Sequence, residues 1–192
     1  MRLGTAAIVI ALISAGSARA AVTVIGNGLA HSCYLAAEHD YSVRGGEEIC
    51  TAALDNNLLS PRDRAATYVN RGVVRSNLRH YQSALDDYDR GIGFGRYLAD
   101  SDLGVAYVDR ASVLNAFGRY TEALESVNKG LSLNTQRPEV ALYNRAIARE
   151  ALGDVKGAWQ DYRQALALVP TFTPAAGELK RFHVETRPAG GS

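Results

Sequence analysis

Neither sign of charge dominates this sequence, and cysteine, tryptophan and proline are all scarce. Its 192 residues include 21 Lys and Arg against 20 Asp and Glu, which excludes the basic surface that holds nucleic acid through its phosphates. Two cysteines are too few for a disulfide scaffold or a four-cysteine zinc site, although they can form one bridge. Hydrophobic residues make up 47% of the chain and charged residues 21%, a composition typical of a globular protein.

The motifs of catalytic and cofactor sites are also missing. The histidines at positions 31, 39, 80 and 183 lack the spacing of metal ligands, and no Gly-x-Ser-x-Gly sequence marks a nucleophile. Glycines at 91, 93 and 95 invite comparison with a phosphate loop, but no Lys-Ser or Lys-Thr follows them and no strand precedes them. We therefore predict no enzyme activity, catalytic residue, metal site or cofactor. A hydrolase with an unrecognised site is the third alternative for the function.

Residues 1–20 have the pattern of a secretory signal peptide. Arg2 supplies the positive start, an apolar run extends from Ala6 to Ile13, and residues 18–20 form a small-x-small cleavage pattern. A helix that crosses a bilayer needs about 20 apolar residues, far more than this run contains, and no later run approaches that length. We predict a cut after Ala20 and a periplasmic or secreted protein with no membrane span. An uncleaved anchor is the alternative.

Cys33 and Cys50 lie in two segments with helical apolar spacing, separated by a turn that contains two glycines. Each cysteine is about equally far from the middle of that turn, so an antiparallel helix pair over 28–58 would place the sulfurs opposite each other. We predict a disulfide between them, because export delivers the chain to an oxidising compartment. The alternatives are two separate reduced, buried thiols, or a catalytic or metal-binding thiol assisted by His31 or His39.

A threefold repeat occupies most of the remaining chain. Small residues recur at the same two spacings in three sets, with periods of 39 and 35 residues: Gly72, Ala84 and Gly91; Ala111, Ala123 and Gly130; Ala146, Ala158 and Ala165. Ala and Gly allow two antiparallel helices to approach closely, and periods of this length are typical of stacked structural units. Each set therefore predicts one helix hairpin.

The small residues also predict what packs against them. In each set the second and third lie on one face of the second helix, where they would admit large side chains of neighbours. The candidates for these side chains are Tyr81, Tyr88, Tyr120, Tyr162 and Trp159. Gly118 and Gly153 suit the left-handed conformation that ends a helix, so they predict the inner turns of the second and third hairpins.

This pattern resembles the tetratricopeptide repeat, a 34-residue helix–turn–helix unit. In that register the repeats cover 65–98, 104–137 and 139–172, with an extra loop around 93–97, and Pro170 matches the family's closing proline. Arginines at 71, 110 and 145 stand where the family usually has leucine, while Arg75, Leu114 and Arg149 stand where it often has an aromatic residue. The resemblance implies an all-α, right-handed solenoid of stacked helix hairpins.

The two ends of the chain depart from the repeat. The helix pair over 28–58 is predicted as a degenerate repeat, because it lacks the small-residue spacing. Residues 173–185 are predicted to form a capping helix, with Leu179 and Phe182 facing the last repeat, and residues 186–192 a flexible tail. Signal, disulfide hairpin, repeats and cap together resemble small exported tetratricopeptide proteins of bacteria.

Each repeat carries an Asn-Arg or Asp-Arg pair directly before its first small residue: Asn70-Arg71, Asp109-Arg110 and Asn144-Arg145. One interpretation places these side chains in a ligand groove. The other, which we favour, pairs each arginine with an acid on the second helix, since acids at 87 and 161 stand equally far after the first and third arginines. Ser126 takes that place in the second repeat, so Arg110 requires a different partner.

The resemblance also implies a binding groove, because in the family the first helix of each pair lines the concave face. By position the groove residues are Val69, Asn70, Val73, Asn77, Val108, Asp109, Ser112, Asn115, Tyr143, Asn144, Ile147 and Glu150. Some family members grip a terminal carboxylate with lysines here, but no lysine occurs on these first helices, so we expect a peptide held by amides and aliphatic contacts. The expected function is a protein-binding adaptor or assembly scaffold. The alternative is a homo-oligomeric structural envelope protein.

Overall fold

The computed structural model describes residues 21–24, 28–39, 45–56 and 58–182. The predicted signal peptide, the end of the predicted cap and the predicted tail lie outside these ranges. The described residues are helical, with no strand among them. Their helices are α1 (Leu29–His39), α2 (Gly46–Asp55), α3 (Pro61–Asn77), α4 (Tyr81–Gly93), α5 (Asp100–Ala116), α6 (Tyr120–Ser132), α7 (Pro138–Ala151), α8 (Val155–Leu168) and α9 (Thr173–Leu179), with a short 3₁₀ helix η1 (Gly95–Tyr97).

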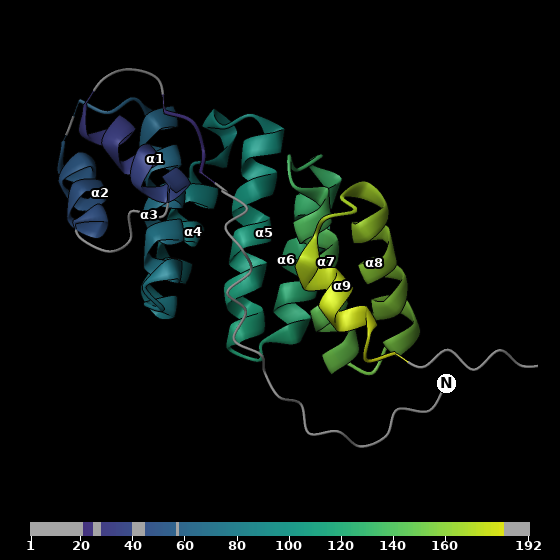
Figure 1. The fold of residues 1–192 in the computed structure, drawn as a ribbon. Coiled ribbons are helices and arrows are strands. Elements are labelled where there is room, and N and C mark those ends of the chain that lie inside the picture. The colour runs from purple at the N-terminus through teal and green to yellow at the C-terminus, as the bar shows by residue number, and fades with distance from the viewer. Residues whose placement is uncertain (1–20, 25–27, 40–44, 57, 183–192) are drawn as a thin grey trace, which may run out of the picture.

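The helices pack in chain order, as the prediction of an all-α stack requires. Figure 1 shows α1 with α2, α3 with α4, α5 with α6 and α7 with α8 as hairpins that stand side by side in a row. Each second helix also contacts the first helix of the following hairpin, and α9 packs on α8. The first helices contact one another as well, α1 with α3, α3 with α5 and α5 with α7. Together α1, α3, α5 and α7 form what we call the first-helix face.

Glycines set the closest approaches within each hairpin. A Cβ at Gly72 would come within 2.7 Å of the Tyr88 ring, and a Cβ at Gly91 within 2.7 Å of the Val69 side chain. Gly130 meets Val108 in the same way in the next hairpin, at 2.8 Å. The last small residue of these two sets therefore accommodates a valine from its own hairpin's first helix. We expected a large side chain such as tyrosine here, whereas the side chain nearest to an added Cβ at these two positions is a valine.

The helices begin earlier than the repeat register predicts. Helix α3 starts at Pro61, because the Ser60 hydroxyl accepts a hydrogen bond of 3.0 Å from the Asp63 N–H and proline favours the first helical position. Helix α5 starts at Asp100, and the segment predicted as an extra loop contains η1. There Gly95 is buried against Leu103, where an added Cβ would come within 2.9 Å of that side chain.

The first hairpin is closed by a disulfide between Cys33 and Cys50, as predicted, and both cysteines are fully buried. No described cysteine is free, so the alternatives that require thiols are wrong. A loop of this length typically contributes about 3 kcal/mol to stability. A structural disulfide is consistent with an extracellular or other oxidising location. None of the described helices is long and apolar enough to cross a membrane.

The last hairpin ends in an aromatic cluster. Tyr143 of α7 packs edge-on against Phe172 with ring centroids 5.6 Å apart, and Tyr162 of α8 packs against Phe182 at 5.9 Å. Leu179 also packs on this cluster, so the predicted contact of the C-terminal helix with the last repeat is confirmed. Burial of these side chains stabilises the end of the row, where no further hairpin follows among the described residues.

The turn after α3 contains an unfavourable residue and gives a first prediction. Gly118 and Gly153 adopt positive φ angles, as predicted, whereas the equivalent residue of the first repeat is Arg79, with φ 62°. A side chain in this region costs about 1 kcal/mol, so Arg79→Gly should raise the free energy of unfolding by about 1 kcal/mol in urea titrations. Gly118→Ala should lower it by a similar amount. A change of the same sign in both variants would contradict this explanation.

Candidate functional site: the first-helix face

The predicted groove residues differ widely in exposure. Asn77 and Ser112 are exposed, and four others are half-buried: Val73, Asp109, Ile147 and Glu150. The remaining six are buried: Val69, Asn70, Val108, Asn115, Tyr143 and Asn144. The position in the repeat therefore does not separate residues that face solvent from residues that face the core.

Several of these residues serve the packing of the hairpins. Val69 and Val108 fill the spaces over Gly91 and Gly130, and Tyr143 belongs to the C-terminal aromatic cluster, so none of the three offers a surface to a partner. Glu150 accepts two hydrogen bonds of 3.0 Å from the Arg181 guanidinium, which fixes the chain after α9 to α7.

Asn70 makes the most informative contact on this face. Its Oδ1 accepts a hydrogen bond of 2.7 Å from the Val22 N–H, and its Nδ2 donates one of 2.9 Å to the Val22 carbonyl. Arg62 donates to the Thr23 carbonyl at 3.1 Å. The segment 21–24, which we call the N-terminal strap, thus lies on α3 and is held through its main chain. The alternation in Val22-Thr23-Val24 is a short sequence signal for an extended segment, which we did not predict, but it does not indicate the contact with Asn70.

The amides in the other two repeats are used differently. Asn115 Nδ2 donates to the Asn144 carbonyl at 2.9 Å, and Asn144 Nδ2 donates to the Val108 carbonyl at 3.4 Å. These contacts tie α7 to α5. In the third hairpin, the equivalent of Asn70 therefore joins two neighbouring hairpins and holds no extended segment.

Asp109 occupies the middle position of this series and is poorly satisfied. Its side chain is 12% exposed, and Arg137 approaches its Oδ1 at 3.5 Å. Burial raises the pKa of Asp109 to about 7, although the charge of Arg137 opposes the shift. Asp109 Oδ2, Asn115 Oδ1 and Arg137 Nε are buried without a hydrogen-bond partner. The middle of the first-helix face thus holds unused hydrogen-bonding capacity.

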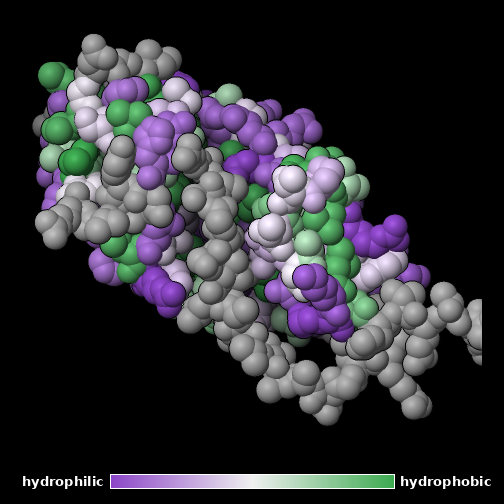
Figure 2. Space-filling view, viewed as in Figure 1, coloured by the Kyte–Doolittle hydropathy of each residue, from purple (hydrophilic) through white to green (hydrophobic). Residues whose placement is uncertain are grey.

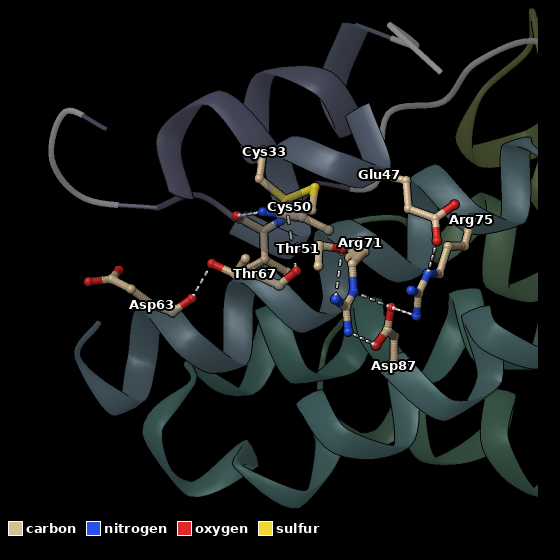
Figure 3. Close-up of a disulfide and its surroundings, with 11 residues drawn as sticks. Cys33, Glu47, Cys50, Thr51, Asp63, Thr67, Arg71, Arg75 and Asp87 are labelled. Carbon is tan, nitrogen blue, oxygen red and sulfur yellow. Dashed lines mark hydrogen bonds and ion pairs between the residues drawn. A yellow bond between two sulfur atoms is a disulfide. The ribbon is translucent and has the colours of Figure 1, made fainter. Parts of the chain in front are cut away.

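The arginines of the Asn-Arg pairs have structural partners. Arg71 donates two hydrogen bonds of 2.8 Å to the two carboxylate oxygens of Asp87, which is fully buried (Figure 3). Arg75, one turn later, shares the same carboxylate at 2.9 Å and also binds Glu47 of α2. Arg71 further donates to Thr51, so this network joins α2, α3 and α4.

The third hairpin repeats this arrangement. Arg145 binds both oxygens of Asp161, at 2.9 and 2.7 Å, and Arg149 shares Asp161 at 2.8 Å. Arg145 also reaches Asn128 of the preceding hairpin at 3.4 Å. In both hairpins the acid lies sixteen residues after the first arginine, so the pairing predicted from sequence is confirmed.

The second hairpin lacks both the acid and the second arginine of this cluster. Ser126 stands in place of the acid and donates to the Tyr107 carbonyl, while the fully buried Leu114 stands in place of the second arginine. Arg110 finds the different partner that its sequence required, Asp89 of the preceding hairpin, at 2.7 Å. The second arginine is therefore present only in the repeats whose second helix supplies a buried carboxylate.

Comparison of the chain with models of known protein families finds no match, and comparison with curated proteins finds none either. Among the residues that the structure describes, no group of three His, Cys, Asp or Glu side chains is placed to hold a metal ion. The candidate site is therefore defined by its geometry on the first-helix face. The side chains of Asn70 and Arg62 bind main-chain atoms of the strap, and the Asp109 carboxyl has an oxygen without a hydrogen-bond partner.

The shared carboxylate gives a second prediction. Asp87→Ser removes the carboxylate that the buried Arg71 and the half-buried Arg75 share, and should lower the free energy of unfolding by about 3–5 kcal/mol. Adding Arg75→Leu copies the second hairpin and should recover about 1 kcal/mol or more, measured by urea titration. Asp86→Ser, at the exposed neighbouring position, is the matched control and should change stability by less than about 0.5 kcal/mol. Additive effects of the two changes would contradict the shared-carboxylate model.

Asp109 gives a third prediction, on pH dependence. With a raised pKa of about 7, the folded state retains a proton that the unfolded chain releases above its ordinary carboxyl pKa of 3.8. The free energy of unfolding should therefore fall as the pH rises from about 4 to 7. Asp109→Asn, which restores the amide found in the other two repeats, should remove this contribution. Parallel pH profiles of wild type and variant would contradict the assignment.

Proposed function

We propose that the protein is an exported tetratricopeptide-type interaction module that holds a peptide or partner protein on its first-helix face, as an adaptor or assembly scaffold. The observation that carries this proposal is the contact of Asn70 with the N-terminal strap. One buried amide binds both main-chain polar groups of Val22, and an amide used in this way can hold an extended chain whatever its side chains are.

The repeat assignment is supported by the three sets of small residues and by the hairpins that they form. Glycine brings the helices into contact at two of the three hairpins, and the intervals between equivalent residues are 39 and 35 positions. The first helices contain no lysine, so capture of a terminal carboxylate is disfavoured and a main-chain mode of binding is favoured.

Export to the periplasm is supported by two independent features. Residues 1–20 carry the positive start, apolar run and cleavage pattern of a signal peptide, with the proposed cut after Ala20. The buried Cys33–Cys50 disulfide requires an oxidising compartment to form and persist. A cut at that place makes the strap the first segment of the mature chain.

A fourth prediction tests the face itself. Ser112 is exposed on α5, so Ser112→Arg should block a partner without disturbing the core, and should lower the amount of partner captured from an envelope extract at least tenfold. Gln160→Arg, at an exposed position on the second helix α8, is the matched control and should capture the same proteins as wild type. Capture of the same proteins by both variants would place the binding site elsewhere.

Self-association is a second candidate, favoured by exposed leucines at the N-terminal end. Leu58 is 91% exposed and Leu29 is 47% exposed, and Figure 2 shows hydrophobic surface at the end formed by α1 and α2. A surface of this kind is suited to contact with another chain. Light scattering of the Ser112→Arg protein over a range of concentrations separates the two candidates, because self-association through α1 and α2 would persist in this variant.

A further inference from the structure

We infer that the N-terminal strap is a displaceable occupant of the partner site, and that its chemistry specifies the partner: an extended segment with β-branched hydrophobic residues two positions apart. This inference rests on the proposed function and deepens it. The strap, residues 21–24, precedes α1 in the chain, whereas the side chains that hold it, Asn70 and Arg62, belong to α3. The strap is therefore held by contacts with another helix, which a competing segment could make in its place.

The contacts of the strap with Asn70 and Arg62 select for conformation and not for sequence. Asn70 binds the N–H and the carbonyl of Val22, and Arg62 binds the carbonyl of Thr23, so all three hydrogen bonds fall on main-chain atoms. Any extended chain with a free N–H at the first position can make the same three bonds. Proline at that position cannot, because it lacks the N–H.

The hydrophobic contacts of the strap select for side chains. Val22 is 1% exposed and Val24 is 5% exposed, and both belong to the main core cluster, whereas Thr23 between them is exposed. This alternation is that of an extended strand lying on a hydrophobic surface. Two compact, branched side chains at alternate positions are therefore the recognition element, and the residue between them points outward, where the Thr23 side chain hydrogen-bonds Tyr34.

Asp109 explains how a partner can gain over the strap. A competing segment recovers the contacts that the strap makes, but the strap is tethered and acts at an effective concentration on the order of millimolar. The partner needs an additional contact to overcome this advantage. Asp109 stands one repeat after Asn70, with a buried Oδ2 that has no hydrogen-bond partner. A partner whose ammonium group reaches this carboxyl would favour its ionised form and gain it as an acceptor.

The fifth prediction uses the strap sequence as a probe in trans. The probe is a labelled synthetic peptide with the sequence of residues 21–27, acetylated at its N-terminus. It should bind the Val22→Asp/Val24→Asp protein at least tenfold more tightly than it binds the wild-type protein. The reason is that acids cannot occupy the buried positions, so the strap of this variant leaves the site free. The same peptide N-methylated at its first valine should lose at least tenfold in affinity, because it cannot donate to Asn70. Equal binding of the two peptides, or no binding of either to the folded variant, would overturn the inference.

Thr23→Asp is the control for charge, because it places a carboxylate on the exposed side of the strap, although it adds one negative charge where the double variant adds two. The peptide should bind this variant as weakly as wild type, and circular dichroism should show unchanged helicity in every variant. Tight binding to Thr23→Asp would mean that charge near the site, and not vacancy of the buried positions, recruits the peptide, which contradicts the inference.

Hydrogen exchange on the unmodified protein provides a test that requires no substitution. A displaceable strap opens without unfolding the stack, so the Val22 amide should exchange at least tenfold faster than the Val69 amide in the core of α3. Equal protection of the two amides would show that the strap opens only with the whole protein and would overturn the inference.

The failures of the two proposals are distinguishable. If Ser112→Arg abolishes capture while the peptide fails to bind the strap variant, the first-helix face is the partner site and the strap is a fixed part of the core. If the peptide binds as expected but Ser112→Arg captures the same proteins as wild type, the strap site stands and the wider adaptor function falls. A stable dimer of the unmodified chain that the peptide dissociates would assign the site to the strap of a second copy, and would overturn the choice of a different partner.

Discussion

The close approach of paired helices at small residues is the constraint on which the rest of the structure depends. Gly72, Gly91 and Gly130 remove the side chain where a tyrosine or valine of the paired helix must enter. Because the helices come this close, the side chains around each glycine are fully buried, and burial of this kind provides most of the driving force for folding. The same proximity brings arginine and aspartate within bonding distance across the first and third hairpins.

The three hairpins show two solutions to one packing problem. In the first and third, a buried carboxylate lies between two arginines, so the charge is compensated and every carboxylate oxygen is used. In the second, serine and leucine occupy the places of the acid and the second arginine, so these two places carry no charge. A lone acid or a lone arginine would be unfavourable in this environment. The positions therefore change together, and the chain carries its own internal comparison.

The sequence was sufficient to predict the hairpins, the disulfide, the aromatic contacts of the cap and the arginine–aspartate pairs, because each depends on spacing within one or two adjacent helices. It was less informative about the first-helix face. Val69 and Val108 share the helices predicted to line the groove, yet they face their own glycines, a distinction set by the rotation of each helix. The contact between Asn70 and Val22 joins residues 48 positions apart and depends on how the first hairpin seats against α3. No local pattern contains that information.

The hydrogen bonds between Val22 and Asn70 make the strap part of the folded domain. Asn70 is fully buried, and the strap supplies the partners of its amide oxygen and nitrogen. An aminopeptidase that trimmed the chain past Val22 would leave that amide unsatisfied, at a cost of about 1–3 kcal/mol. Proteolytic removal of the strap would therefore lower the stability of the protein and expose α3 to a partner in the same step.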